Sequence, residues 1–362
     1  MKTLGVLGGG QLARMLALAG YPLGVKVIAY EPTMANSASG VTDVVRGSFT
    51  DEKKLKQFAQ QVDAVTVETE NIPVTAAQYI ADCVDFYPSL MALEIAQDRL
   101  LEKQYLNELG IKTAGFADIN SEDDLKAAVD ALGLPCVLKT RRFGYDGKGQ
   151  YWLRCQDDLA RAWQGMGGQP LILEAAVGFD FEISVIGVRD QQGHIKVYPI
   201  TANTHRNGVL HVSKVLDNSA LQQQAEGYIE RLLDKLNYVG VLTIEFFSLQ
   251  GELIANEIAP RVHNSGHWTL DAAVTSQFEN HLRAVLGLPL GEVSALGHAA
   301  MINCLGAMPK LEEVLSLSDQ ARYHCYGKSA RAGRKVGHIN LCLDSATLLA
   351  EQLQCLESRL FC

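Results

Sequence analysis

The sequence predicts a mixed α/β and α+β protein of three domains, and three observations lead to this prediction. Strands and helices alternate through the first hundred residues, a small α+β unit follows, and long strands dominate the remainder. Alternating strands and helices favour a parallel sheet with covered faces, whereas successive long strands suggest an antiparallel sheet. We expect a Rossmann-like parallel-sheet domain at 1–100, a small central domain at 101–175 and an antiparallel-sheet domain at 176–362.

The elements of each domain follow from short apolar runs and helical periodicity. In the first domain we expect strands and helices at Leu4–Leu7, Gln11–Ala19, Val25–Tyr30, Asp51–Gln60 and Ala64–Val67. In the central domain we expect them at Arg99–Leu109, Glu122–Leu132, Cys136–Thr140, Gln150–Leu153, Asp157–Met166 and Leu171–Ala175. In the third domain the strands are expected at Asp180–Val188, Ile195–Ile200, Val209–Val215, Val239–Ser248 and Glu252–Ile258, with covering helices at Leu221–Leu236 and Gln277–Leu286.

Composition and charge restrict the class of function. The 362 residues are 48% hydrophobic and 20% charged, and the formal net charge is −9. This acidic balance, without any Lys/Arg run longer than two, argues against a nucleic-acid partner. The sequence contains no run of 18 apolar residues, so we expect no membrane span. The N-terminus lacks the features of a signal peptide. The eight cysteines form no C-x-x-C pair, so we expect free, mostly buried thiols in a reducing cytoplasm.

A glycine turn joins the first strand to the first helix. Gly8, Gly9 and Gly10 allow a tight turn whose helix N-terminus could face an anion. The turn resembles a dinucleotide fingerprint, and Glu31 follows at a suitable distance, but Ala13 stands where the third glycine belongs. NAD binding, a purely structural turn and contact with another phosphate or ligand all remain open from this pattern.

A second glycine-rich segment, KTRRFGYDGKGQ, begins at Lys139 and connects two predicted strands. Its backbone N–H groups could close over a triphosphate, with Lys139 supplying positive charge. The alternative is a β-hairpin, because Asp146-Gly147 is a type I′ turn signal. A P-loop is excluded, since G-x-x-x-x-G-K-[ST] is absent.

Two carboxylates on a predicted hairpin suggest a metal site. If pairing is symmetric about Gly251, Glu245 lies directly opposite Glu257, with Cβ atoms about 4.5–5.5 Å apart on one face. The other face would carry Ile244, Phe246, Asn256 and Ile258. Opposed carboxylates are destabilising unless a cation bridges them, and such ligands suit Mg²⁺ bound to substrate phosphates. A solvated strand face, or a different register, is the alternative.

Polar side chains gather after the second strand of this hairpin. Arg261, His263, Asn264, Ser265 and His267 fall within seven positions, and such clusters at strand ends usually face a ligand. A second cluster, Lys328, Arg331, Arg334 and Lys335, is basic in an acidic protein. It is either a solvated turn or a clamp for a phosphate.

Together these segments resemble the ATP-grasp superfamily and, within it, the 5-(carboxyamino)imidazole ribonucleotide synthetase family. The matching stretches are GGGQLARML at 8–16, VETENIP at 67–73, DRLLEKQYL at 98–106, GYDGKGQ at 144–150, NEIAPRVHNSGHWT at 256–269 and GRKVGHIN at 333–340. They span nearly the whole chain, and HNSGHWT and GYDGKGQ are the most specific. Ala13 stands where that family most often has glycine, a mild departure that concerns no catalytic residue.

The resemblance implies an ATP-grasp fold whose central domain is a lid, and an ATP-dependent carboxylate–amine ligase of purine biosynthesis. ATP and Mg²⁺, or Mn²⁺, would convert bicarbonate to carboxyphosphate. The amine of 5-aminoimidazole ribonucleotide would capture the carbon, with ADP and phosphate as the other products. The physical logic is that phosphorylation gives bicarbonate a leaving group, while the protein screens charge and excludes water.

The resemblance also implies residue roles. For ATP they are Arg99, Lys139, Gly144, Tyr145, Asp146, Gly147, Lys148, Gly149, Gln150, Glu174, Ala175, Ala176, Val177, Glu182, His205, Asn256 and Glu257. The metal would lie on Glu245 and Glu257, and the catalytic residues would be Tyr145, Asp146, Arg261, His263 and Asn264. The ribonucleotide would contact Gln11, Leu12, Glu68, Asn264, Lys328, Arg334 and Lys335.

Several other functions stay open at this point. Within the superfamily they are a formate-using glycinamide ribonucleotide transformylase and a biotin carboxylase. Outside it they are a dinucleotide-dependent oxidoreductase, suggested by the Gly8–Gly10 turn, and a non-catalytic nucleotide-binding regulator. Members of the resembling family are commonly dimers, so the resemblance implies a homodimer.

Overall fold

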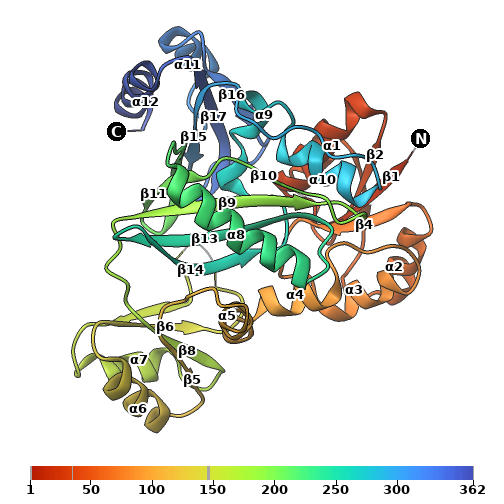
Figure 1. Cartoon of the computed structure of the whole chain (residues 1–362). Helices are drawn as coiled ribbons and strands as arrows, with labels where there is room; N and C mark the ends of the chain where they lie inside the picture. Colours follow the sequence, from red (N-terminus) through yellow and green to blue (C-terminus); the bar gives the residue numbers. More distant parts are fainter. Residues whose placement is uncertain (1, 35, 145–146, 362) are drawn as a thin grey trace.

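The computed structural model describes residues 2–34, 36–144 and 147–361, and three β-sheets form within them. Figure 1 shows the N-terminal sheet on one side, long strands through the middle and a small sheet with two helices set below them. The carboxyl-terminal segment rises from the other end of the long strands. The mixed architecture expected from the sequence, with one parallel sheet and antiparallel sheets, is confirmed.

The N-terminal sheet is parallel and has the strand order β3-β2-β1-β4. Three of its segments were not expected from the sequence, namely β3, α3 and α4. Strand β3 has only four residues, and helices α3 and α4 have almost no charged residues, so no polar face marks a helical period. The elements are β1 (Thr3–Leu7), α1 (Gln11–Gly20), η1 (Tyr21–Leu23), β2 (Lys26–Glu31), η2 (Ala38–Gly40), β3 (Asp43–Arg46), α2 (Glu52–Ala59), β4 (Ala64–Val67), α3 (Val74–Ala81) and α4 (Leu90–Gln97).

The small sheet is antiparallel, with the order β5-β8-β6-β7. Its helix α6 starts where the side chain of Ser121 accepts a hydrogen bond from the backbone N–H of Asp124, and acidic residues fill its first turn. The elements are α5 (Arg99–Glu108), β5 (Phe116–Ile119), α6 (Glu122–Leu132), β6 (Cys136–Thr140), β7 (Gln150–Leu153), α7 (Asp158–Met166) and β8 (Leu171–Ala175).

The large sheet is antiparallel, with the order β14-β13-β9-β11-β12-β15-β17-β16, and β10 pairs with β9. The strand expected at Ile195–Ile200 ends already at Val197. The elements are β9 (Phe181–Arg189), β10 (Ile195–Val197), β11 (Thr201–Arg206), β12 (Val209–Val215), α8 (Ser219–Lys235), β13 (Gly240–Leu249), β14 (Glu252–Ala259), η3 (Asn264–Gly266), α9 (Thr269–Ala272), α10 (Gln277–Val285), β15 (His298–Leu305), α11 (Leu311–Leu317), β16 (Arg322–Cys325), β17 (Lys335–Leu343) and α12 (Ala346–Leu360).

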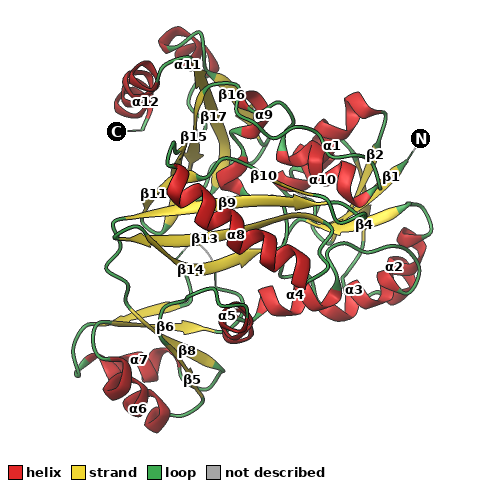
Figure 2. Cartoon of the chain, in the orientation of Figure 1, coloured by secondary structure: helices red, strands yellow, loops and turns green. Residues whose placement is uncertain are grey.

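The parts differ in how they share hydrophobic cores. Leu16 of α1 and Leu282 of α10 lie in one core cluster together with Val241 of β13, so the N-terminal sheet unit and the large sheet are packed together. Helix α8 lies across β9, β13 and β14 and buries its apolar face there (Figure 2). The small sheet and its helices α6 and α7 form a separate core cluster. The small sheet with α6 and α7 therefore has a hydrophobic core of its own.

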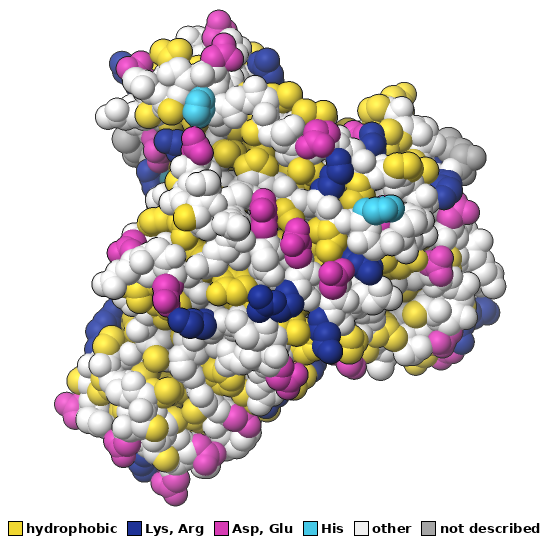
Figure 3. All heavy atoms as spheres, viewed as in Figure 1, with side chains coloured by type: hydrophobic (Ala, Val, Ile, Leu, Met, Phe, Trp, Pro, Cys, Tyr) yellow, Lys and Arg dark blue, Asp and Glu magenta, His cyan; other side chains and the backbone are white. Residues whose placement is uncertain are grey.

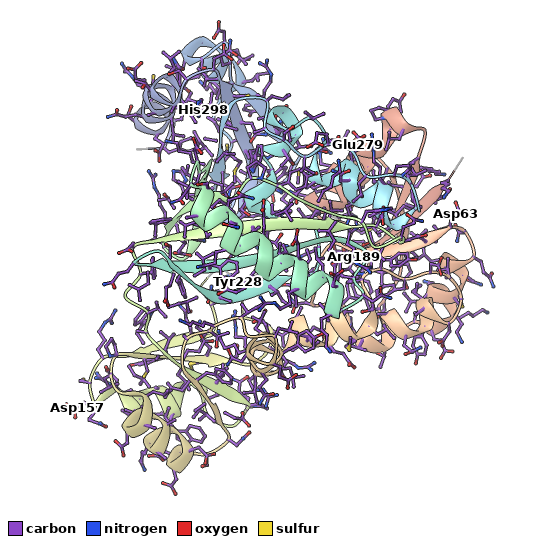
Figure 4. All side chains as sticks on the ribbon, in the orientation of Figure 1. Asp63, Asp157, Arg189, Tyr228, Glu279 and His298 are labelled. Carbon is purple, nitrogen blue, oxygen red and sulfur yellow. The ribbon has the colours of Figure 1, made fainter. Side chains whose placement is uncertain are left out.

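The surface agrees with the composition. On the face shown in Figure 3, acidic and basic side chains are interspersed, and neither sign forms a continuous area. Within the described ranges, no helix combines the length and apolar character that crossing a bilayer requires. Figure 4 labels residues on three parts of the molecule, with Asp63 before β4, Asp157 before α7 and His298 at the start of β15.

The seven described cysteines are free thiols, as expected. The expectation that they are mostly buried is wrong. Cys136 and Cys304 are buried, whereas Cys83, Cys155 and Cys325 are exposed.

Candidate active site

A cavity of about 830 Å³ lies where the three sheets meet. Its walls come from the start of α1, the loop after β4, the junction of α4 and α5, the small sheet, the β13–β14 hairpin and β17. Such a cleft between structural units is the usual place for a ligand site. Most of the residues singled out in the sequence line it, although they are far apart in the chain.

The glycine turn is closed by the protein's own carboxylates. The backbone N–H of Gly10 donates to Glu68, and that of Ala13 donates to the same carboxylate at 3.1 Å. The N–H of Gly9 donates to Glu31 at 2.9 Å. The N–H groups that would face a dinucleotide pyrophosphate are therefore already bound. The structure favours a turn that presents Glu68 to the cavity over a dinucleotide site.

The basic cluster lies beside this turn. Lys328 donates a hydrogen bond to the side chain of Gln11, and Lys335 lines the cavity. Burial, followed by the charge of Arg334, lowers the pKa of Lys328 to about 8. Arg334 is held by Ser329 at 3.0 Å, and neither Arg334 nor Lys328 is among the residues that line the cavity. This concentration of positive charge at one end of the cavity suits a phosphate group.

The glycine-rich segment lies over the other end of the cavity. Strand β6 ends at Thr140 and pairs with β7, which starts at Gln150, so the connection is a long loop and not a two-residue turn. Gly144, Gly147 and Lys148 of this loop line the cavity together with Gln150, whereas Gly149 does not. Tyr145 and Asp146, which we expected to close over the substrates, lie outside the described residues.

Lys139 and Glu174 form the centre of a buried ion network. The Lys139 ammonium lies 2.9 Å from a Glu174 oxygen, and the Lys103 ammonium lies 3.4 Å from the same oxygen. Burial disfavours the charged carboxylate, but Lys103 and Lys139 outweigh it and lower the pKa of Glu174 to about 2. Burial lowers the pKa of Lys139, against the attraction of Glu174. The Lys139 ammonium, which is buried and ion-paired in this way, can bind an anion in the cavity.

An apolar wall follows Glu174. Ala175, Ala176 and Val177 line the cavity after it, and Phe179 stacks on Phe247 with ring centroids 4.7 Å apart. Exposed backbone beside aromatic side chains fits a flat heterocycle such as adenine. A little farther along, Glu182 lies 3.3 Å from His205, and both line the cavity.

The hairpin carboxylates face each other as predicted, with Glu245 paired to Glu257 between β13 and β14. Near the turn, however, the register of the hairpin differs from the predicted one. From the turn outward, Leu249 pairs with Glu252 and Phe246 pairs with Ala255, and the register then shifts by one residue. Asn256 is thus a β-bulge. Its expected place on the face of Ile244 and Phe246 is wrong, because a bulged residue leaves the strict alternation, and Asn256 lines the cavity beside Glu257.

The oxygen atoms around this bulge fit a hard divalent cation. Burial, and after it the carboxylate of Glu257, raise the pKa of Glu245 to about 7, which marks a site short of positive charge. The side-chain oxygen of Asn256 is buried and has no hydrogen-bond partner. Arg99 supplies part of the missing charge, since it lies 3.1 Å from Glu257. Two carboxylates and an amide suit Mg²⁺ that also binds substrate phosphates. The described residues contain no cluster of three or more His, Cys, Asp or Glu that could hold a metal by itself.

Arg261 and His263 lie between the two ends of the cavity. Glu70 accepts a hydrogen bond from Arg261 at 2.6 Å, and Arg261 holds the pKa of Glu70 below its usual value although burial opposes this. Burial, and next the charge of Arg261, lower the pKa of His263 well below its usual range, so its imidazole is neutral. The Nε2 atom of His263 is 3.6 Å from Glu245.

Asn264 connects the cavity to a buried polar cluster. It exchanges hydrogen bonds with Asn303 at 2.7 and 3.0 Å and contacts His267 at 3.0 Å. Ser265 and His267, which we expected to face a ligand, are fully buried and do not line the cavity. His267 instead contacts Tyr326 behind the cavity wall. Only part of the polar run after β14 is therefore accessible to a ligand.

Several residues of the site were not recognised in the sequence. Glu70, Glu102, Phe179 and Phe247 line the cavity, and Lys103 lies directly behind it. Glu102 and Lys103 look like ordinary surface residues of a helix, since glutamate and lysine are rarely buried. The adjoining stretch VETENIP at 67–73 contains Glu70 and could have suggested it.

Three family models match successive parts of the chain. The ribonucleotide synthetase preATP-grasp domain matches residues 1–97, and the ATP-grasp domain matches residues 104–278. The phosphoribosylaminoimidazole carboxylase C-terminal domain matches residues 299–352.

Relatives match over almost their whole length. The N5-carboxyaminoimidazole ribonucleotide synthase of Pseudomonas aeruginosa is 48% identical over 348 residues, which cover 96% of each chain. The crystal structure of the N5-carboxyaminoimidazole ribonucleotide synthetase of Thermus thermophilus is similar with a TM-score of 0.95 and 46% identity, covering 99% of this chain and 98% of that one. An Aspergillus clavatus synthase in complex with ADP and 5-aminoimidazole ribonucleotide has a TM-score of 0.90 at 29% identity, covering 99% and 98%.

Proposed function

The chain belongs to the ATP-grasp family of N5-carboxyaminoimidazole ribonucleotide synthases, and from this premise we propose how its own residues carry out the reaction. The activity is the ATP-dependent carboxylation of 5-aminoimidazole ribonucleotide in purine biosynthesis. The observation that supports the residue roles most strongly is the continuity of the cavity. It joins an end suited to a nucleoside triphosphate to an end suited to a phosphorylated ribonucleotide, with Arg261 and His263 between them.

ATP is proposed to bind between the small sheet and the β13–β14 hairpin. Adenine would lie against Ala175–Val177 and the stacked rings of Phe179 and Phe247, and the ribose would contact Glu182. The phosphates would meet Lys139 and the N–H groups of the glycine-rich loop. Glu245 and Glu257, with Asn256, would hold Mg²⁺ or Mn²⁺, which supplies charge neutralisation of the phosphates when bound.

The ribonucleotide is proposed to occupy the opposite end. Its 5′-phosphate would bind near Lys328 and Lys335, and Gln11 and Glu68 would contact the rest of the molecule. Phosphate binding would also favour the charged form of Lys328, whose pKa is lowered to about 8 by burial. This arrangement separates the two phosphate-binding groups, so each substrate has its own set of cations.

The chemistry is proposed to occur between these ends. An oxygen of bicarbonate attacks the γ-phosphorus of ATP, the bond to the β-phosphate oxygen breaks, and ADP leaves. The amine nitrogen then attacks the carbon of carboxyphosphate, and phosphate departs as the C–N bond forms. Arg261, fixed by Glu70, would screen the negative charge of bicarbonate, and neutral His263 would accept the proton that the amine releases. The walls of the cavity would limit the access of water to the labile intermediate.

The proposal predicts a strict substrate pattern. ADP formation should require bicarbonate and 5-aminoimidazole ribonucleotide together with ATP and Mg²⁺. Formate with glycinamide ribonucleotide, or bicarbonate with free biotin, should not replace them. Turnover with either of these pairs at the rate of the proposed substrates would show that the substrate assignment is wrong. A homodimer is proposed from the family resemblance and a cytoplasmic location from the free thiols, and light scattering of the purified protein would test the former.

A further inference from the structure

The metal-ligand geometry depends on one irregular residue. If the register of the turn-proximal pairs continued, Glu245 would lie opposite Asn256, and Glu257 would pair with Ile244 on the other face of the sheet. The bulge at Asn256 prevents this. It brings Glu257 opposite Glu245 and onto the face of the sheet on which Glu245 lines the cavity. Anything that fixes the bulge therefore also fixes the pair of carboxylates.

A bulge also changes which backbone groups point out of the sheet. Strand β14 is the last strand in its sheet, so its outer N–H groups need partners other than a strand. Before the bulge, the N–H of Leu253 donates to the side chain of Gln224 at 2.8 Å, and that of Ala255 donates to the backbone oxygen of Lys112 at 2.7 Å. After the bulge the alternation is shifted, and the N–H of Ile258 becomes the outward one.

Helix α5 supplies partners for the groups that the bulge displaces. The Oε1 atom of Glu102 accepts a hydrogen bond from the N–H of Ile258 at 2.7 Å. The ammonium of Lys103 donates to the backbone oxygen of Asn256 at 3.1 Å. Glu102 is only 2% exposed and Lys103 is 0% exposed. Burying two ionisable side chains is costly unless they are bound, so their place under the bulge calls for a specific role.

We propose that Glu102 and Lys103 are positioning residues that hold the bulge at Asn256 and thereby keep Glu245 opposite Glu257. They act through the backbone of β14 on either side of Glu257. Glu102 accepts a hydrogen bond from the N–H of Ile258, and Lys103 donates one to the carbonyl of Asn256. Lys103 has a second contact with Glu174, so Glu102 isolates the effect on the bulge more cleanly. The inference rests on the proposed function only in assigning the metal to these carboxylates.

The experiment compares Glu102→Leu and Glu102→Gln with wild type, and Gln224→Ala is the matched control. Gln224 also accepts an N–H of the outer edge of β14, but before the bulge. The affinity for Mn²⁺ in the presence of ADP is measured by electron paramagnetic resonance. Amide hydrogen exchange is measured for the β14 peptide in the protein without ligands.

The expected result is selective. Glu102→Leu should weaken Mn²⁺ binding by about tenfold or more and raise exchange of the segment around Ile258 by a similar factor, because a buried N–H loses its acceptor. Glu102→Gln retains an acceptor oxygen and should stay close to wild type. Gln224→Ala should raise exchange near Leu253 and leave Mn²⁺ affinity unchanged. The KM for 5-aminoimidazole ribonucleotide should not change in any variant.

Two results would overturn the proposal. The first is Glu102→Leu with wild-type Mn²⁺ affinity and wild-type exchange at Ile258, and the second is an equal loss of Mn²⁺ affinity in Gln224→Ala. If circular dichroism shows Glu102→Leu to be unfolded, Lys103→Met decides by the same two measurements, since it removes the bond to the Asn256 carbonyl. Hydrogen exchange does not depend on the substrates, so a wrong assignment of the reaction would leave this result readable.

Discussion

Replacing Glu245 by glutamine should stabilise the protein without ligands, even though it removes a proposed metal ligand. In the folded state the carboxylates of Glu245 and Glu257 are paired across two strands, and the Glu245 side chain is only 14% exposed. Burial first, and then the charge of Glu257, raise the pKa of Glu245 to about 7. A glutamine side chain has nearly the same shape but carries no charge, so it removes the repulsion and the cost of desolvating a charge.

The size and the pH dependence follow from this pKa. A carboxyl group whose pKa is raised in the folded state stabilises that state through its bound proton. This stabilisation is complete below the unfolded-state pKa of 4.5 and is lost as the pH rises through about 7. Compared with glutamine, Glu245 should therefore lower the free energy of unfolding by roughly 3 kcal/mol at pH 8.5 and by about 1 kcal/mol at pH 5.5. The gain in stability of Glu245→Gln should therefore grow with pH.

The assay is urea unfolding at both pH values in the presence of a chelator and without nucleotide. Glu252→Gln is the control, because Glu252 lies on the same hairpin but is exposed and paired with Lys112. This control should show no gain in stability. If Glu245→Gln is no more stable than wild type at pH 8.5, or if its advantage is larger at pH 5.5 than at pH 8.5, the charge of Glu245 does not destabilise the fold.

Further predictions concern the ends of the cavity. In the basic cluster, Lys328→Ala should raise the KM for the ribonucleotide by roughly 10- to 150-fold and leave the KM for ATP little changed. An unchanged ribonucleotide KM would reduce this cluster to a solvated turn. Lys139→Ala should instead lower kcat and weaken the use of ATP, because its charge is needed as the γ-phosphoryl group leaves, and kinetics with each substrate varied in turn would separate the two effects. Glu70→Gln should raise the KM for bicarbonate, since Arg261 loses its charged partner, and an effect only on the KM for ATP would contradict this role.

Much of the fold could be predicted because its long elements have a clear period. The alternation of strands and helices in the first hundred residues and the β13–β14 hairpin are strong signals. The short strand β3 and the eight-residue helices α3 and α4 were missed, because their assignment depends on packing and not on local pattern. The strands β15 and β17 are apolar but were not assigned, and they complete the large sheet only through pairing with β12.

The metal pair shows how a correct prediction can have an incomplete reason. Symmetric pairing about Gly251 places Glu245 opposite Glu257, and the structure agrees with that pair. The strand pairs closer to the turn are shifted by one residue from the predicted register. The bulge at Asn256 removes this shift, so that Glu245 pairs with Glu257 as predicted. No local feature of the sequence indicates a bulge at this residue, because it depends on Glu102 and Lys103 beneath the strand.

The buried charges show a second limit of reasoning from sequence. Glu174 was assigned to ATP binding through the resemblance, yet its side chain is held by Lys103 and Lys139, and the residues after it form the apolar wall. A helix that contains adjacent Glu and Lys normally exposes both. Their burial in α5 results from contacts with strands far along the chain, which a single sequence does not reveal.

We expect ATP to activate bicarbonate by phosphorylating one of its oxygen atoms. Incubation of the protein with ATP, Mg²⁺, 5-aminoimidazole ribonucleotide and ¹⁸O-labelled bicarbonate tests this directly. Each phosphate released should carry one ¹⁸O atom, because the C–O bond of carboxyphosphate breaks when the amine attacks its carbon. Mass spectrometry of the phosphate, with rapid quenching to limit isotope exchange between bicarbonate and water, would detect it. Phosphate whose new oxygen comes from water would instead show that ATP is simply hydrolysed and that bicarbonate is not phosphorylated.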